Sequence, residues 1–501
     1  MKRSLCIGVA FVLASHGGWK DTARAEETKP ISIVQAIERA VADNPDLLRE
    51  RVAVAKAAAH QLAAEGQFDV LLDADLGTKR DLVPPLSCTP PCQDLPLVKN
   101  TTTTFGLGLA RGLESGGALR LTALASRATS NAPADSGLLP GTYYTSGLAL
   151  TFTHPLLRGF GTEVTLANLR KTRIQNDAAQ LGRQMRACNV LRDVVVAYWE
   201  LAYATQDLAI KRSALDLAEE QLRITQALIA VGRLADADAA SVERAIAQRQ
   251  EDMATGEQIL FFRSLDLQRL LGQPADLASP LLAATDAPTT GSPQVDEAAE
   301  ASRALEANPQ LRALKLGLGL SQADLATARS TLRPRLDFTG SVGPTGFKPG
   351  LGDSVRQAAG FSALAWSAGL AFELPVENRT ARGQLRVAEE DLTLARLNAE
   401  DFTLQLRDLV LRAARSIRTA GTRVALGQRE VEFARLNLGA ERARFQAGRA
   451  TNNDVLLRQQ ELKDAETRLL RATVDQNESE ATLSAATAEI LDRYGVVLKG
   501  L

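Results

Sequence analysis

Apolar residues recur every seven positions in two long segments, one before Gly232 and one before Gly448. Heptads sustained over this length predict helices that pack as coiled coils, rather than the surface helices of a globular domain. The segment from Leu166 to Val231 would reach roughly 100 Å as one continuous helix. The heptad positions are Val194, Leu201, Leu208, Leu215, Leu222 and Ile229 in the first segment, and Val410, Ile417, Val424, Val431, Leu438 and Phe445 in the second.

A second apolar line follows the first, two residues further along each helix. At about 100° per residue the two lines lie roughly 200° apart, on opposite sides of the helix. Each helix is therefore expected to have a neighbour on both sides, as in a barrel wall one helix thick. The line comprises Val196, Tyr203, Ile210, Leu217, Ile224 and Val231 in the first segment; the second segment keeps Leu426, Phe433, Ala440 and Ala447 but has Arg412 and Thr419 earlier.

The period changes in the stretches that precede the long helices. These stretches are rich in Gly, Leu, Ala and aromatic residues and alternate partly, which is typical of strands in a membrane barrel. Four lie in the first half and two in the second: Leu71–Thr78, Thr103–Ala110, Leu119–Ser126 and Tyr143–Thr153, then Leu336–Val342 and Ala363–Glu373. Tyr143, Phe152, Trp366 and Phe372 are candidates for interfacial aromatic girdles; the alternative is packing inside a soluble sheet.

The order of these parts is duplicated along the chain. Asn44-Pro45 returns 264 residues later as Asn308-Pro309, and Gly232-Arg233 returns 216 residues later as Gly448-Arg449. The first half therefore carries 48 extra residues. We attribute most of them to one hairpin, Thr103–Ser126, which is expected to turn at residues 114–117 and to lie on the extracellular side. The alternative is that this hairpin adds strands to the barrel.

The first 25 residues have the pattern of a secretory signal. Lys2 and Arg3 precede an apolar run from Leu5 to Ala14, and residues 23–25 form a cleavage site of the A-x-A type. Cys6 lies inside the apolar run, so a lipid anchor is not expected. The chain thus divides into the signal (1–25), a first repeat (26–272), a linker rich in Pro, Ala and Thr (273–294) and a second repeat (295–501).

Charge and motifs argue against nucleic-acid binding and catalysis. The net charge is −1, and it becomes −4 without the signal, which holds four basic residues and one acidic residue. Nothing in this balance suggests a nucleic-acid partner. The sequence has no phosphate-binding loop, H-E-x-x-H or G-x-S-x-G motif, and its three His residues do not assemble a metal site. We expect neither an enzyme nor a cofactor.

Three cysteines follow the signal. Cys88 and Cys92 flank Thr-Pro-Pro in a proline-rich loop, and export would favour a disulfide between them. Two free thiols are the alternative for this pair. Cys188 falls on an apolar helical face and is expected in the core.

Taken in order, the motifs resemble those of the TolC-like outer-membrane efflux proteins. They are the two Asn-Pro helix starts, the strand exits at residues 154–159 and 374–379, the segment Ala197–Leu201 and the paired Gly-Arg turns. The resemblance extends over essentially the whole mature chain. It implies an α+β membrane protein built from two strand-helix repeats. Three protomers of four strands each would form one outer-membrane β-barrel, continued by a long periplasmic α-helical barrel.

The resemblance also implies a function and partners. The homotrimer would be a passive exit duct of a tripartite efflux or type I secretion system in the outer membrane of a Gram-negative bacterium. Its partners would be a periplasmic adaptor protein, an inner-membrane pump or ABC exporter, and outer-membrane lipid. Drugs, metal ions and polypeptides remain open as cargo. The alternative function is a periplasmic coiled-coil adaptor or scaffold.

Within this family, short segments outside the barrels form an equatorial belt, and the periplasmic helical tips dock the adaptor and narrow the pore. The belt would come from Ile31–Asp43, residues 273–294 and the residues after Thr487. The tips map to Gly232-Arg233-Leu234 and Gly448-Arg449-Ala450. Alternatively, the two glycines only terminate helices.

The resemblance further implies an acidic ring at the pore constriction. Asp454 matches the first aspartate of the family pattern, whereas the second falls on Leu457, and Arg458 follows. Asp238 holds the equivalent place in the first half. Three copies of Asp454 around one axis would raise its pKa and favour bound cations. The alternative for both aspartates is a favourable charge at a helix N-terminus.

Overall fold

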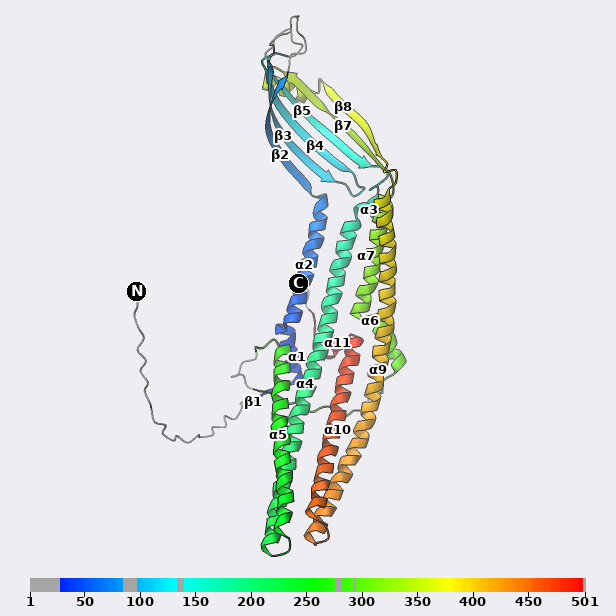
Figure 1. Ribbon diagram of the computed structural model, residues 1–501. Helices are drawn as coiled ribbons and strands as arrows, with labels where there is room; N and C mark the ends of the chain where they lie inside the picture. Colours follow the sequence, from blue (N-terminus) through cyan, green and yellow to red (C-terminus); the bar gives the residue numbers. More distant parts are fainter. Residues whose placement is uncertain (1–27, 84–96, 133–138, 275–280, 292–293, 499–501) are drawn as a thin grey trace, which may run out of the picture.

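The computed structural model describes residues 28–83, 97–132, 139–274, 281–291 and 294–498. The protein is a long rod with a β-sheet at one end and two helical hairpins at the other (Figure 1). The predicted signal, residues 1–25, and the pair Cys88 and Cys92 lie outside the described residues. No helix in the described ranges has the length and apolar character needed to cross a membrane.

The heptad segments form the two hairpins. Helix α4 (Ala167–Ala230) has 64 residues and is followed by α5 (Asp236–Leu270), and α9 (Arg379–Gln446) has 68 residues and is followed by α10 (Asn452–Ala486). The six first-line heptad residues of α9 are all buried. The helices pack in the order α5-α4-α10-α9 (Figure 1). Helices α4 and α10 thus have a neighbour on each side, as expected for a wall one helix thick.

Two shorter helices, α2 (Pro45–Glu65) and α7 (Pro309–Thr331), run from the middle of the rod to the sheet. Each begins with a buried Asn cap followed by Pro, which explains why Asn-Pro is repeated. The Asn44 side chain accepts from two backbone N–H groups of the first turn and donates to the Leu270 carbonyl at 2.8 Å. Asn308 does the same toward the end of α10. Each cap therefore ties a helix start to the end of a long hairpin.

A belt of short segments lies along the middle of the rod. Tyr198 of α4 is wholly buried there, and its hydroxyl lies 2.8 Å from the Asp286 carboxylate. Cys188 lies in the same core, as predicted, and burial raises the pKa of its thiol to about 11. The described parts of the three expected segments lie here, and α6 is an addition. The belt elements are β1 (Thr28–Ile31) paired in parallel with β6 (Leu281–Ala284), α1 (Ile33–Asp43), α6 (Glu297–Ala307) and α11 (Ile490–Arg493).

All six predicted strands form one antiparallel sheet in the order β2-β3-β4-β5-β7-β8. Short helices η1 (Gly66–Phe68) and α3 (Thr162–Thr165) join it to α2 and α4. The strands are β2 (Val70–Val83), β3 (Val98–Gly112), β4 (Ala118–Ser130), β5 (Gly141–Pro155), β7 (Arg335–Lys348) and β8 (Leu364–Glu373).

The hairpin Thr103–Ser126 does not lie where we expected it. Its strands β3 and β4 are full members of the sheet between β2 and β5, so this sheet has six strands rather than the four implied by the resemblance. Its turn lies at the helical end, where the Gly161 N–H donates to the Ser115 carbonyl at 3.1 Å. The extracellular placement was wrong because the polar ends of both strands continue the hydrogen-bond ladders of β2 and β5.

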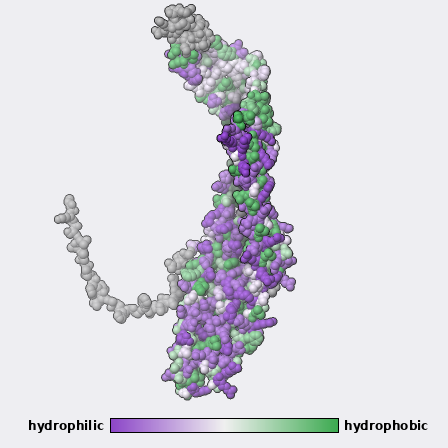
Figure 2. All heavy atoms as spheres, turned by 45° about the vertical axis from the view of Figure 1, so that its right-hand side comes forward, coloured by the Kyte–Doolittle hydropathy of each residue, from purple (hydrophilic) through white to green (hydrophobic). Residues whose placement is uncertain are grey.

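Strand alternation gives the sheet an apolar face and a polar face. On the polar face, Tyr143 stacks on Phe347 with ring centroids 5.2 Å apart, so it does not share a girdle with Trp366. In Figure 2 the sheet end is mostly white and green, whereas the helical end is mostly purple. The apolar face carries Leu72, Leu76, Phe105, Leu107, Leu109, Leu121, Leu148, Leu150, Phe152, Val342, Trp366, Leu370 and Phe372, and the polar face carries Asp73, Asp75, Arg120, Thr122, Thr151, Asp337, Ser341 and Glu373.

Helix α8 (Leu351–Ala359) is an element that the sequence analysis missed. It follows β7 and packs on the apolar face over β5 and β7. The Ser354 hydroxyl donates to the Gly346 carbonyl at 3.0 Å and lies 2.8 Å from the Ser146 hydroxyl. Glycine is needed at 346 because a Cβ there would come within 2.0 Å of the Ser354 carbonyl oxygen.

Candidate functional site: the helical tips

Both hairpins turn with the same backbone geometry at the end of the rod farthest from the sheet (Figure 1). Gly232 and Gly448 both have φ of +73°, a conformation that favours glycine. The N–H of Arg233 donates to the Leu228 carbonyl at 2.9 Å, and that of Arg449 donates to its counterpart five residues back at 2.8 Å. These bonds are the Schellman motif that ends a helix at glycine. The glycines therefore do terminate helices, and the turns they make are the tips.

The two tips lie against each other. A Cβ atom added to Gly448 would lie 3.4 Å from Nη2 of Arg233. Leu234 and Ala450 both pack on one apolar cluster that includes Phe445 and Val455. The sequence-predicted tip residues are thus brought together within a single chain.

Asp454 and Asp238 each cap the helix that leaves a tip. The Asp454 carboxylate accepts from the Thr451 N–H at 2.8 Å and from the Thr451 hydroxyl at 2.7 Å. These hydrogen bonds, helped by the charge of Arg458, lower the pKa of Asp454 in the single chain. The Asp238 carboxylate accepts from the Ala235 N–H at 3.1 Å. Within this single chain, both aspartates therefore act as negative charges at a helix N-terminus.

Arg458 lies one turn further along α10 and contacts a different partner. Its Nη1 lies 2.7 Å from a carboxylate oxygen of Glu461. The structure thus does not pair Arg458 with Asp454, although the two charges act on each other through space.

A buried polar network, which the sequence analysis missed, joins the two hairpins just above the tips. The Asn452 side-chain oxygen accepts from Gln221 Nε2 at 2.8 Å and from Thr225 Oγ1 at 2.9 Å. All three side chains are at most 4% exposed. The sequence did carry one signal for this network. Gln221 and Thr225 are polar residues at positions i and i+4 of α4, on the line that faces α10.

A second layer of the network lies further up the same interface. Buried Arg249 of α5 donates through Nη1 to the Gln459 side-chain oxygen and to the Ala214 carbonyl, both at 2.9 Å. Gln459 also donates to the Leu217 carbonyl at 3.1 Å. Burial lowers the pKa of Arg249. Helices α4, α5 and α10 are therefore connected by hydrogen bonds as well as by apolar contacts.

A charged cluster lies higher, where α4 and α10 meet below the belt. Arg471 contacts Glu200 at 2.6 Å, Asp475 at 2.6 Å and Glu478 at 2.9 Å, and lies over the Tyr203 ring. Burial raises the pKa of Glu478 to about 7, because desolvation outweighs the attraction of Arg471 and the Glu200 carboxylate stands beside it. Three acidic groups thus share the Arg471 guanidinium, and two of them have a second arginine as partner.

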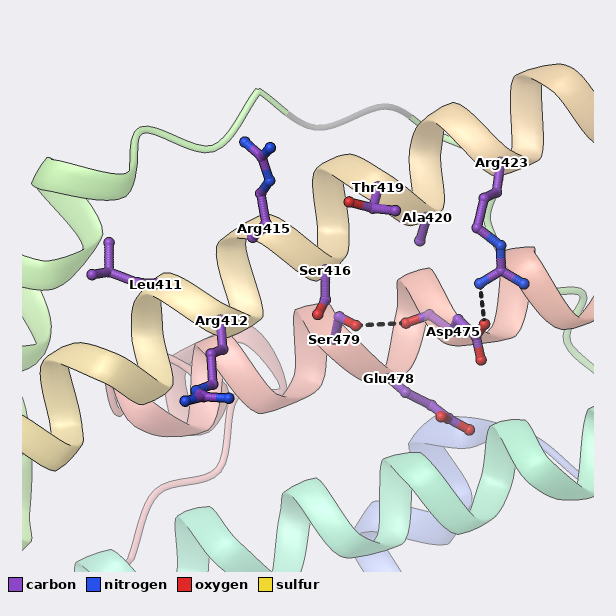
Figure 3. Close-up of a pocket in the computed structure, with 10 residues that line it drawn as sticks. All are labelled: Leu411, Arg412, Arg415, Ser416, Thr419, Ala420, Arg423, Asp475, Glu478 and Ser479. Carbon is purple, nitrogen blue, oxygen red and sulfur yellow. Dashed lines mark hydrogen bonds and ion pairs between the residues drawn. The ribbon is translucent and has the colours of Figure 1, made fainter.

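Helices α9 and α10 enclose an open hollow of about 710 Å³ beside this cluster (Figure 3). Arg423 reaches across it to Asp475 at 2.6 Å, whereas Arg412 and Arg415 project from α9 (Figure 3). The hollow offers guanidinium groups but no group of His, Cys, Asp and Glu in the described part of the chain is arranged to hold a metal ion.

Comparisons with known proteins agree with this geometry. A family model described as outer membrane efflux protein matches residues 112–273 and 301–489. Nodulation protein T of Rhizobium leguminosarum bv. trifolii is 23% identical over 316 residues, which are 62% of this chain and 65% of that protein. The pyoverdine export outer membrane protein OpmQ of Pseudomonas aeruginosa is 25% identical over 299 residues, 58% of this chain and 59% of that protein. The matches thus span less than two thirds of either relative.

Solved structures share the fold over most of the chain. The outer-membrane channel OprN has a TM-score of 0.66 at 18% identity, with 91% of this chain and 89% of that chain covered. The outer membrane protein VceC of Vibrio cholerae has a TM-score of 0.64 at 16% identity, with 91% and 96% covered. The family model matches one stretch in each half and most of the sequence. The chain therefore belongs to the outer membrane efflux protein family, which confirms the resemblance to TolC-like proteins.

Proposed function

We propose that the chain is one protomer of a homotrimeric exit duct in the outer membrane of a Gram-negative bacterium. In this proposal three sheets close one β-barrel, and the helices continue it as a periplasmic α-helical barrel. The duct conducts substrates passively and has no catalytic role. A periplasmic adaptor and an inner-membrane pump or ABC exporter deliver the cargo. The segments 26–272 and 295–501, joined by 273–294, are the two repeats that form the wall.

The sheet faces support a membrane position and carry the proposal. Along β3, the outward residues Phe105, Leu107 and Leu109 lie between Thr103 and Arg111. The eight residue-to-residue steps from Thr103 to Arg111 rise about 27 Å along the tilted strand, close to the height of the apolar band of an outer-membrane barrel. The opposite face is polar, with Arg120 paired to Asp73 at 2.5 Å, as suits a water-filled lumen.

The free edges of the sheet support closure by further copies. Strands β2 and β8 pair on one side only, and all ten residues of β8 are exposed. Unpaired edges are unfavourable in lipid, where every backbone group needs a partner. If β8 of each copy paired with β2 of the next, three copies would close a ring of 18 strands with no free edge.

The helices also have open sides. On α9 the second apolar line is exposed, with Leu426 and Phe433 each 61% accessible. The corresponding residues of α4, Ile210 and Leu217, pack within the chain. Ile210 lies against the core of the belt, and Leu217 lies against the cluster at the α9–α10 hairpin. At the other end of the row, α5 exposes Phe262. An α9 of one copy beside an α5 of the next would cover both.

At the tips we propose two roles for the residues identified from the sequence. Residues 232–234 and 448–450 would dock the adaptor, since they end the rod. Asp454 and Asp238, with Arg458 one turn further, would line the pore constriction. A threefold axis would bring three copies of Asp454 together and oppose the lowering of its pKa seen in one chain.

The cargo we favour is small molecules rather than polypeptides. The observation behind this is that one relative is a pyoverdine export protein by name. The alternative of a periplasmic adaptor does not fit the family match.

Cell fractionation followed by gel electrophoresis tests the duct. The protein should stay in the outer-membrane fraction after carbonate washing, and unheated samples should migrate at three times the mass of heated samples. Purified protein should conduct ions in planar bilayers. Release by carbonate together with monomeric migration would overturn the proposal.

A further inference from the structure

Cations gather at one end of the apolar face of the sheet. Arg80, Lys99, Arg127 and Lys348 all point to this face in the strand register, near the strand ends farthest from the helices. All four are exposed, and none has an acidic partner among the described residues. Within the described ranges, Arg80 Nε donates only to the Thr101 hydroxyl, at 3.4 Å. A position above an apolar band and a lack of acidic partners leave these charges available to an anionic ligand.

The polar face gives an internal comparison. There Lys79 pairs with Asp81 at 3.1 Å, Arg120 with Asp73 at 2.5 Å, and Arg335 with Asp337 at 2.6 Å. The acidic residues of the six strands all lie on that face: Asp73, Asp75, Asp81, Asp337 and Glu373. Unpaired positive charge is therefore a property of the apolar face.

The spacing of the cations suits a ligand with more than one anionic group. Arg127, Tyr144 and Lys348 stand in one row across three adjacent strands. At ~4.8 Å per strand, the first and last lie about 10 Å apart. Tyr144 between them adds a phenolic hydroxyl, a group that commonly sits at membrane interfaces.

An apolar groove of about 390 Å³ begins directly below this row. Ala125 and Ser146 of the groove are the next outward residues below Arg127 and Tyr144. One wall is α8 with the turn that follows it. Val355 of the helix and Phe361 of the turn lie at its edge, 48% and 65% exposed. The rest of the lining is apolar, and includes Phe105, Leu107, Ala123, Leu148, Pro344 and Ala358.

We propose that this row and groove bind a phosphorylated glycolipid of the outer leaflet. The phosphates lie on Arg127, Lys348 and Arg80, and an acyl chain lies in the groove beside α8. The inference rests on the proposed function, in which the apolar face contacts the outer membrane. A glycolipid with two phosphates fits better than a phospholipid with one, because the unpaired cations spread over four strands.

Lipid titration of the intact, detergent-purified protein tests the site. The probe is bis-phosphorylated lipid A in mixed micelles, with bound copies counted by native mass spectrometry. The variant Arg80→Gln/Arg127→Gln/Lys348→Gln should bind roughly 100-fold more weakly, since each cation near a lipid head group contributes about fivefold. Salt should weaken binding to the unmodified protein more than to this variant.

The matched control is Lys79→Gln/Arg120→Gln/Arg335→Gln, which removes the same charge from the polar face. It should bind lipid A as the unmodified protein does. Dephosphorylated lipid A and phosphatidylglycerol are the comparison lipids. Their affinity for the unmodified protein should be no higher than the affinity of lipid A for the apolar-face variant. Equal weakening in both triple variants, or equal binding of either comparison lipid, would overturn the proposal.

Failure of the lipid site is distinguishable from failure of the duct. Both triple variants should still give the heat-sensitive oligomer and conduct ions. If the oligomer and conductance persist but lipid A binding is unchanged in the apolar-face variant, only the lipid site is wrong. A monomeric protein released by carbonate would instead overturn the duct and the membrane position together.

Discussion

Asn452 joins the two helical hairpins through two buried side chains. It holds Gln221 and Thr225, two buried groups that have been taken out of water. A buried polar group that loses its partner costs about 1–3 kcal/mol. The tips are therefore held together by hydrogen bonds that are costly to remove singly.

The variant Asn452→Ala should destabilise the region just above the tips by about 1–3 kcal/mol. Hydrogen exchange at residues 221–225 should accelerate accordingly, because α4 loses its partner on α10. Asn453→Ala is the control, since Asn453 is exposed. Equal exchange rates in the two variants would contradict the role of the network.

Glu478 should make the stability of the rod depend on pH. Its carboxyl titrates near 4.5 when unfolded and at about 7 when folded. Between these values the folded state binds the extra proton, so stability falls as pH rises through the window and the loss is complete above 7. Thermal unfolding of Glu478→Gln should show a flatter profile between pH 5 and 8. An unchanged profile would contradict the raised pKa.

Asp454 caps a helix, and we propose that it also contributes a charge to the pore constriction. Asp454→Asn keeps an oxygen that accepts from Thr451 but removes the charge, whereas Asp454→Ala removes both. If the charge forms the constriction, both variants should weaken the block of single-channel current by divalent cations. Block that is normal in Asp454→Asn would leave only the cap.

At the scale of elements, the two tips are the parts most alike in the halves of the chain. Each has a glycine at φ +73°, an arginine after it and a capped helix start. The surrounding helices fix their place at the end of the rod (Figure 1). Their shared geometry suits one kind of partner contact repeated around a ring.

Charge reversal at a tip should weaken adaptor docking. Arg449→Glu should lower crosslinking to the cognate adaptor severalfold, while Arg429→Glu, exposed on α9 well away from the turn, should not. Crosslinking that is undiminished in Arg449→Glu would argue against this contact.

Local pattern determined the elements but not their placement. The heptads from Val194 to Ile229 predicted α4 because helical periodicity acts between near neighbours in sequence. The hairpin Thr103–Ser126 was predicted as strands yet placed outside the sheet, because its ladder partners on β2 and β5 are decided by pairing at long range. Helix α8 was missed because its partner surface, around Gly346 and Ser146, exists only once β5 and β7 are paired.

At the scale of the whole molecule, a single chain leaves the second apolar line of α9 exposed to solvent. Phe433 of this line is 61% exposed, so the chain alone does not bury it. Burial of such a side chain contributes about 1.5–3 kcal/mol. In the proposed trimer, this line of α9 would therefore stabilise the assembly rather than the single chain.

Phe433→Asp should prevent formation of the heat-sensitive oligomer, because it would bury a carboxylate without a partner between copies. Its effect on the protomer should be small, as judged by circular dichroism. The neighbouring exposed Glu432→Gln is the control. An intact oligomer in Phe433→Asp would place the contact elsewhere.

The sequence by itself determined the long helices, the six strands, the Asn-Pro caps and the glycine tips, because each depends on residues close together along the chain. The family also followed from these motifs. Only the tertiary structure decided which face Tyr143 occupies, that Asn452 joins two hairpins, and that Arg127 and Lys348 stand in one row. These features depend on register and packing between segments up to 231 residues apart, which no local pattern encodes.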